Sequence, residues 1–257
     1  MKRFIVFNLL FFIFILYATY TYAGIAVQPT VTEMSVAQGK TVEGIYTVIN
    51  TGTDEMIVTI KPVDWLEKYL KQESTADVNT WLSFDKTEFS VSPGEMKKIK
   101  YTVTVPYKLM EEQVAQVYFA FRNKEQAEMF KTRLGVIFYL GIKGKEHLEA
   151  SVDKVQINTS GNEDGTYNIR TAAVTIKNSG NVHIRPFGVV RVRKNHEEVA
   201  RVEIKSGKGI YAGKTDIVYG IGEDIKLTPG TYEAEAEIDC GMYDIENKIS
   251  KKIYFTI

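Results

Sequence analysis

The alternation of polar and apolar residues with a period of two constrains this chain more than any other feature. It is clearest in Lys98–Val105, and Val42–Ile49 repeats it with many β-branched residues. Successive side chains of an extended strand point to opposite faces, so this pattern gives one buried and one solvated face. Such runs recur along the chain with turn signals at intervals of roughly 8–12 residues. The sequence therefore predicts an all-β protein made of sandwiches.

Two turn signatures occur twice, in the same order. They are Asn50–Gly52 and Asn178–Gly180 at strand ends, and Ser92–Gly94 and Thr228–Gly230 before strands. A repeated order of this kind indicates two domains of one type. We expect two tandem immunoglobulin-like sandwiches, at residues 24–146 and 147–257, with the polar Lys143–His147 as the linker. The stretch Asp64–Lys71 is the main exception, because its apolar residues recur at helical spacing and predict a short helix within a loop.

The N-terminus has the layout of a secretory signal peptide. The basic Met1–Arg3 precedes the apolar Phe4–Leu16, and Thr21–Ala23 offers a cleavage point before Gly24. We therefore assign residues 1–23 as a signal peptide and expect a periplasmic or extracellular protein. The alternative is an uncleaved anchor, which would be the chain's one attachment to a membrane. The apolar run is shorter than the ~20 residues that a membrane span requires, which favours cleavage.

Composition excludes several classes of partner and chemistry. Lys and Arg number 32, as do Asp and Glu, so no net field attracts nucleic acid or an anionic membrane. Cys240 is the single cysteine, so no intrachain disulfide can form, and we expect it to be a small core residue on a strand.

Candidate catalytic and metal-binding residues are sparse. The only histidines are His147, His183 and His196, and none accompanies a nucleophile motif or a second ligand at metal spacing. We expect His183 to be a half-buried strand residue that donates a hydrogen bond. The acidic Gly161–Gly165 lacks the spacing of a calcium loop and reads as a hairpin turn. The sequence thus predicts a protein that is not an enzyme, with no catalytic residue, cofactor or metal.

Motifs in the first domain resemble those of a known family. They are Lys40–Val42, Val48–Asn50, the strand ending near Trp65, Phe89–Glu95, and Lys131–Leu134 at the start of the last strand. Together they resemble the N-terminal domain of periplasmic pilus chaperones (PapD-like proteins), and more broadly the immunoglobulin-like domains related to major sperm protein. The resemblance implies an extracytoplasmic chaperone-like protein that binds pilus or other surface-fibre subunits by β-strand addition.

The same resemblance assigns a partner-binding strand. Leu134, Val136, Phe138 and Leu140 would form the face lent to a client protein, and main-chain hydrogen bonds would supply affinity. The alternative is a central strand that is buried on both faces within this protein. In the family a pair of basic residues, one on the first strand and one on the last, binds the client's terminal carboxylate. Arg133 stands at the last-strand position, whereas the first strand, Ile25–Met34, contains no Lys or Arg.

A sequence motif in the second domain indicates a different function. Asn178–Gly188 is similar to a stretch of secreted Gram-positive surface proteins of the WxL-interacting type. That resemblance implies a cell-surface or periplasmic scaffold or adhesion protein, which would bind folded partners or an envelope polymer. The partner is then another envelope protein rather than a fibre subunit.

Overall fold

The computed structural model describes residues 24–70, 76–124, 132–205, 207–222 and 226–257. The predicted signal peptide at residues 1–23 lies outside the described residues. Strands dominate the described chain and helix is scarce, as predicted, and the chain divides into two compact units. The first unit holds residues up to Thr32, Thr41–Thr104 and Val114–Tyr139. The second holds Glu33–Lys40, Val105–Gln113 and Leu140–Ile257.

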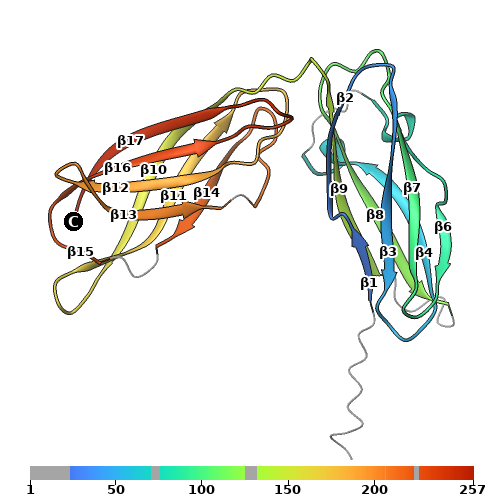
Figure 1. The fold of residues 1–257 in the computed structure, drawn as a ribbon, viewed down its shortest axis with the longest axis horizontal. Coiled ribbons are helices and arrows are strands. Elements are labelled where there is room, and N and C mark those ends of the chain that lie inside the picture. Colours follow the sequence, from blue (N-terminus) through green and yellow to red (C-terminus); the bar gives the residue numbers. More distant parts are fainter. Residues whose placement is uncertain (1–23, 71–75, 125–131, 206, 223–225) are drawn as a thin grey trace, which may run out of the picture. The chain divides into compact units, whose positions relative to one another are not determined.

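Two sheets form the first sandwich (Figure 1). One has the strand order β1-β3-β7-β5, with β1 Ile25–Gln28, β3 Thr41–Asn50, β7 Met96–Thr104 and β5 Leu82–Phe84. The other has the order β2-β9-β8-β4-β6, with β2 Val31–Val36, β9 Thr132–Ile142, β8 Gln113–Asn123, β4 Met56–Asp64 and β6 Glu88–Val91. The π-helical turn η1, Leu66–Leu70, follows β4, and the 3₁₀ turn η2, Val78–Thr80, precedes β5. The short helix predicted at Asp64–Lys71 is therefore present as a single turn.

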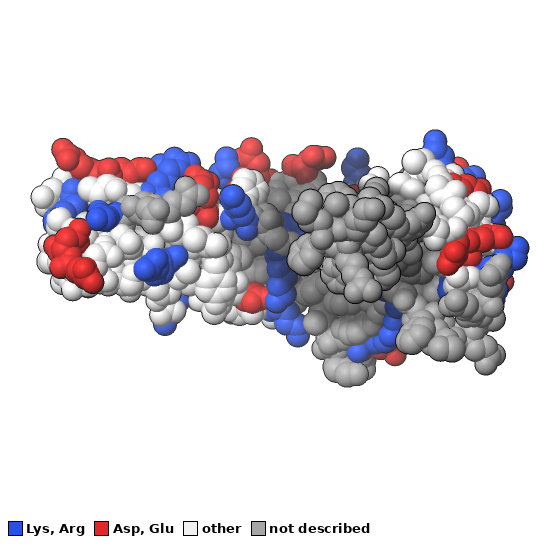
Figure 2. Space-filling model, turned by 90° about the horizontal axis from the view of Figure 1, so that it is seen from below, with Lys and Arg blue, Asp and Glu red and all other residues white. Residues whose placement is uncertain are grey.

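Two further sheets form the second sandwich. One has the order β10-β11-β14, with β10 Ala150–Gly161, β11 Tyr167–Asn178 and β14 Thr215–Ile221, and the short β15, Lys226–Leu227, also pairs with β11. The other has the order β13-β12-β16-β17, with β13 Glu197–Ile204, β12 Phe187–Lys194, β16 Thr231–Asp239 and β17 Lys248–Thr256. On the face shown in Figure 2, basic and acidic residues are interspersed rather than segregated, in keeping with the balanced composition.

Aromatic rings join the two sheets of the first sandwich. Tyr46 on β3 lies 5.1 Å from Tyr101 on β7 and 5.4 Å from Phe119 on β8, measured between ring centroids. Phe138 on β9 lies 5.4 Å from Tyr101 and 5.9 Å from Trp81. All five side chains are buried. Rings at these separations and tilts add about 0.5–1.5 kcal/mol per pair beyond the area that they bury.

The repeated Asn-Ser/Thr-Gly signature has the same structural role in both sandwiches. Asn50 is fully buried, and its amide donates to the carbonyls of Asp54 and Val91 at 2.7 and 2.9 Å. Asn178 is also fully buried and donates to Val182 and Ile210 at 2.8 and 2.9 Å. Each side-chain oxygen also accepts from the glycine N–H two residues on. Each Asn therefore satisfies loop carbonyls that would otherwise lack partners.

The segment predicted as a linker is an ordered turn of the second unit. The N–H of Lys143 donates to the carbonyl of Val36 at 3.0 Å, and the N–H of Lys145 donates to Ile142 at 2.8 Å. The side chain of Asn181 then donates to the carbonyl of Lys145 at 2.8 Å. Hydrogen bonds thus tie Lys143–His147 to two other segments of this unit. Among the residues that the structure describes, no helix is long and apolar enough to cross a membrane.

Candidate functional site

Strand β9, which carries all the predicted partner-binding residues, lies between β2 and β8. Valine, isoleucine and aromatic residues favour the extended conformation along it. The N–H of Ile137 donates to the carbonyl of Thr30 at 3.2 Å, and that of Lys143, just after β9, donates to Val36. From the first bond to the second, the donor and the acceptor both move toward the C-terminus by the same number of residues. The strand β2 therefore runs parallel to β9. Because β2 begins only at Val31, the first residues of β9 extend beyond it.

The inner face of β9 belongs to the core of its own sandwich. Val136, Phe138 and Leu140 are buried, and Leu134 at the start of the strand is half-buried. Phe138 packs against Trp81 and Tyr101, as described above. These side chains are therefore not available to a client in this conformation. The predicted donated face is an interior face instead, because the aromatic core needs these side chains to fill it.

The backbone of the start of β9 points toward an edge of the sheet. Backbone hydrogen-bonding groups of successive strand residues alternate in direction. Since Ile137 donates toward the β2 side, Gly135 and Arg133 direct their N–H and C=O groups to that side as well. Both residues are exposed and lie before the point where β2 begins. The side chain of Gln116 on β8 fills the space that a Cβ of Gly135 would need.

Basic side chains gather around Tyr118 on β8, next to this edge. The guanidinium of Arg133 lies 4.9 Å from the centroid of the Tyr118 ring, and the ammonium of Lys68, from η1, lies 5.1 Å from it. Lys61 on β4 is paired with Tyr118 across the sheet, so its side chain leaves the same face. We call Arg133, Lys68 and Lys61 the basic cluster. The sequence indicated only Arg133, since the other two come from separate elements and carry no motif.

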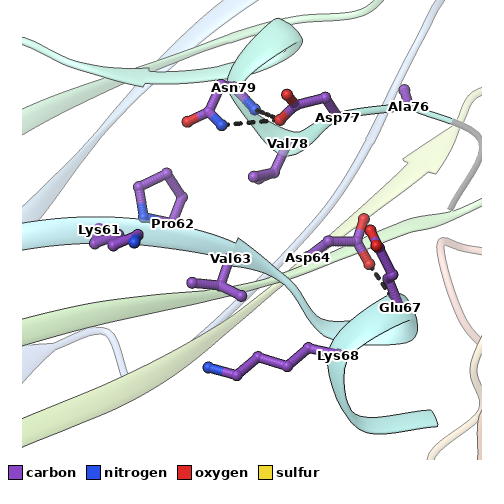
Figure 3. A pocket seen from close by; sticks show the side chains of 10 residues that line it. All are labelled: Lys61, Pro62, Val63, Asp64, Glu67, Lys68, Ala76, Asp77, Val78 and Asn79. Carbon is purple, nitrogen blue, oxygen red and sulfur yellow. Dashed lines mark hydrogen bonds between the residues drawn. The ribbon is translucent and has the colours of Figure 1, made fainter. Parts of the chain in front are cut away.

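A cleft of about 700 Å³ adjoins the basic cluster between the end of β4, η1 and η2 (Figure 3). Lys61 and Lys68 line it together with carboxylates that already serve as helix caps. Asp64 accepts from the N–H of Glu67 at 2.9 Å, and Asp77 accepts from the N–H of Asn79 at 2.9 Å. Helix capping accounts for the positions of Asp64 and Asp77, so neither needs a ligand to explain it. The carboxylate of Glu67 also lines the cleft, so three acids face two lysines there and the cleft itself has no excess of positive charge.

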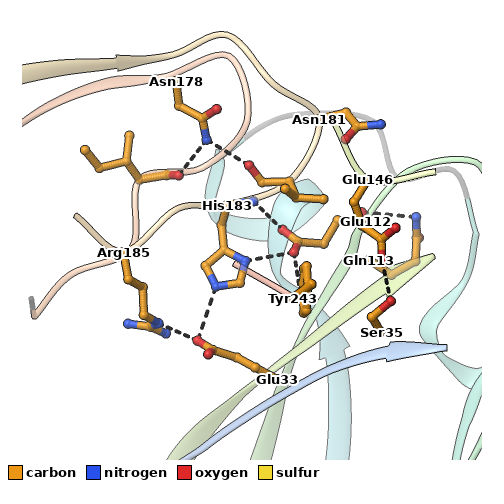
Figure 4. Close-up of polar contacts among 12 residues, drawn as sticks. Glu33, Ser35, Glu112, Gln113, Glu146, Asn178, Asn181, His183, Arg185 and Tyr243 are labelled. Carbon is orange, nitrogen blue, oxygen red and sulfur yellow. Dashed lines mark hydrogen bonds and ion pairs between the residues drawn. The ribbon is translucent and has the colours of Figure 1, made fainter. Parts of the chain in front are cut away.

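The second unit contains a buried ionic network centred on His183 (Figure 4). Its Nδ1 lies 2.7 Å from Oε1 of Glu112, and its Nε2 lies 3.2 Å from Oε1 of Glu33. The backbone N–H of His183 donates to the other oxygen of Glu112 at 2.8 Å. Arg185 donates to Glu33, and the Tyr243 hydroxyl donates to Glu112 at 2.7 Å. His183 is fully buried in an irregular segment before β12, so the prediction of a half-buried strand residue was wrong.

The backbone around Tyr243 is shaped to deliver its hydroxyl to this network. Tyr243 and Asp244 have φ of 52° and 64°, and Met242 and Ile245 exchange backbone hydrogen bonds across them as in a two-residue hairpin. The left-handed region costs a residue with a side chain about 1–3 kcal/mol. Gly141 is needed opposite, because a Cβ there would lie 2.8 Å from the Tyr243 ring.

Charge pairing sets the protonation of the network. Burial opposes the imidazolium, but hydrogen bonds and charges from Glu112 and Glu33 outweigh it and raise the pKa of His183. The hydrogen bond from His183 lowers the pKa of Glu33, and Arg185 adds to that effect. Burial, and then the charge of Glu112, raises the pKa of the Tyr243 phenol. No local signal in the sequence marks this convergence, since residues that bond to each other in it are as much as 152 residues apart.

The remaining candidates from the sequence have structural roles. Cys240 is buried in the core of the second sandwich, and burial raises the pKa of its thiol to about 12, so it is an unreactive core residue. Gly161–Gly165 forms the turn between β10 and β11, with Asp164 accepting from the N–H of Thr166 at 3.0 Å. Within the described residues, no group of three or more His, Cys, Asp or Glu side chains is placed to hold a metal.

Comparison with known proteins found likeness in structure alone. No family model matches the chain, and no curated protein matches it in sequence. The chain is similar to the class 5 fimbriae chaperone CfaA, at 14% identity over 89% of this chain and 98% of that one, with a TM-score of 0.46. It is also similar to the CsuC–CsuE chaperone–subunit complex of Acinetobacter baumannii (14% identity, 88% and 98% covered, TM-score 0.45). A third similar structure is the Pseudomonas aeruginosa CupB2 chaperone (10% identity, 88% and 98% covered, TM-score 0.44).

Proposed function

We propose that this protein is an extracytoplasmic chaperone-like protein that binds a subunit of a surface fibre, or another envelope protein, by β-strand addition. A strand of the partner would pair with the edge of β9. One observation at the start of β9 carries the proposal. The N–H and C=O groups of Arg133 and Gly135 point to the side of the sheet on which β2 lies, but at a level that β2 does not reach. Strand addition uses such groups for affinity. It also covers an edge that would otherwise invite aggregation.

The basic cluster supports a carboxylate at the end of the added strand. A guanidinium forms paired hydrogen bonds with a carboxylate, and Arg133 lies exposed beside the edge. Lys68, from η1, shares the Tyr118 ring with Arg133. Each cation lies about 5 Å from the same centroid, so the two are no more than about 10 Å apart. Lys68 thus offers the second cation that the first strand lacks.

Paired synthetic peptides test this proposal. Each peptide has alternating apolar residues and is made once with a free C-terminal carboxylate and once with an amide. We expect the carboxylate form to bind about 10- to 150-fold more tightly, since a hydrogen bond to a charged group contributes about 1.5–3 kcal/mol. Arg133→Ala should abolish this preference in fluorescence anisotropy titrations. Lys98→Ala removes an exposed cation of β7 in the other sheet and should keep it. Equal binding of both forms by the unaltered protein would contradict the proposal.

A scaffold that binds folded partners is the second candidate, and one observation favours it. The outward side chains of β14, at one end of its sheet, are large, apolar and exposed: Ile217 at 42%, Tyr219 at 57% and Ile221 at 77%. Exposed apolar patches of this kind mark interaction surfaces. A protein whose binding resides there would retain its partner in the Arg133→Ala variant.

A further inference from the structure

The ionic network of the second unit has no part in the proposed strand addition. Of the described Asp, Glu, Lys, Arg and His residues, only Glu112 and His183 are buried. Two separate segments of the second unit supply the carboxylates. Glu33 begins Glu33–Lys40, and Glu112 lies near the end of Val105–Gln113. His183 thus bonds both segments to the body of the unit.

The geometry requires a doubly protonated imidazole. Each ring nitrogen of His183 lies within hydrogen-bond distance of a carboxylate oxygen, which can only accept. Both nitrogens must therefore donate, and only the imidazolium carries two N–H groups. The neutral ring would turn a lone pair toward one of the carboxylates.

We infer that His183 is a proton-controlled latch, which holds Glu33–Lys40 and Val105–Gln113 against the rest of the second unit and loosens both segments when it loses its proton. The charged and titratable groups that face it are Glu33, Glu112, Arg185 and Tyr243. With His183 protonated, His183 and Arg185 balance Glu33 and Glu112, and the charge of Glu146 also acts on Tyr243. Loss of the proton leaves one carboxylate in excess in a buried site, which weakens the attachment of both segments.

The direction of the pH effect follows from the shifted pKa values of His183 and Glu33. The pKa of His183 is higher in the folded protein than in the unfolded chain. Its stabilising effect is therefore complete below about pH 6.5 and is lost as the pH rises through the folded value. The pKa of Glu33 is lowered, so its effect is present above its unfolded value and is lost as the pH falls through the folded one. The latch is closed between these two transitions and opens on the alkaline side when His183 deprotonates.

Nuclear magnetic resonance of the full chain across pH 5 to 10 tests the latch. His147 and His196 are the only other histidines, so the imidazole signals are few. We expect His183 to titrate above the ordinary histidine value of about 6.5. Amide protection of the two segments, corrected for intrinsic exchange, should fall with the same midpoint. The fall should be about tenfold for each pKa unit by which folded His183 exceeds the ordinary histidine value.

Two variants complete the test. His183→Gln should remove this pH dependence, whereas His147→Gln, which alters an exposed His–Glu pair, should leave it intact. Constant protection of both segments while His183 titrates would overturn the inference, and so would an unchanged pH dependence in His183→Gln. If His183→Gln does not fold, the comparison of midpoints in the unaltered protein decides the question. None of these readouts depends on strand addition at β9.

Discussion

Val136→Glu is expected to lower the free energy of unfolding of the first unit by about 4 kcal/mol or more, because it forces a carboxylate into an apolar interior without a partner. Val136 is buried on the inner face of β9, the face that Phe138 shares with the aromatic core. A loss of this size is a large fraction of the unfolding free energy of a typical domain. Chemical denaturation followed by near-ultraviolet circular dichroism measures the loss.

Thr132→Glu is the matched control for this change. It introduces the same charge in place of another β-branched residue of the same strand, but at an exposed position. We expect its effect to stay within about 0.5 kcal/mol, as for an ordinary surface substitution. If Val136→Glu unfolds no more easily than Thr132→Glu, the inner face of β9 is not part of the core. The face of Leu134, Val136, Phe138 and Leu140 would then be open to a partner, as the sequence resemblance implies.

Glu112→Ala is expected to cost the second unit about 3–5 kcal/mol, because removing one member of a buried pair leaves the other charge uncompensated. Glu112 accepts from the ring and the backbone N–H of His183 and from the hydroxyl of Tyr243. All three donors lose their acceptor in the variant. Thermal unfolding at pH 6, where His183 is protonated, gives the largest difference from the unaltered protein.

A second His–Glu pair in the same unit is the control. Glu149 lies 3.3 Å from Nε2 of His147, and both side chains are more than 60% exposed. Exposed ion pairs contribute little because water screens them, so Glu149→Ala should change stability by no more than about 0.5 kcal/mol. Equal losses from Glu112→Ala and Glu149→Ala would show that the network does not depend on buried charge pairing.

Local patterns predicted the fold well, because strands and turns depend on neighbouring residues. The alternation in Lys98–Val105 predicted β7, and the Asn-Ser/Thr-Gly signatures predicted equivalent strand ends in both sandwiches. The same patterns could not decide which face of β9 is buried. Apolar residues occupy both faces of that strand, so only the packing of Phe138 against residues of other strands settles it.

Long-range polar contacts were beyond the sequence for a different reason. Glu33, Glu112, His183 and Tyr243 are ordinary residues in unremarkable local contexts, and they become a network only when the fold brings them together. The hydrogen bonds of Lys143–His147 are a related case. A short polar segment with a glycine suits a flexible linker and an ordered turn equally, and only its bonds to Val36 and Asn181 distinguish the two.

The exchange of two amide protons tests strand addition most directly. Arg133 and Gly135 direct their N–H groups to the edge that an added strand would cover. Saturation with a peptide of the free-carboxylate series should slow hydrogen exchange at both amides by about tenfold or more, since each gains a main-chain hydrogen bond of roughly 0.5–1.5 kcal/mol and loses contact with water. Unchanged exchange at both amides, with the peptide bound, would show that binding occurs elsewhere and would contradict strand addition at β9.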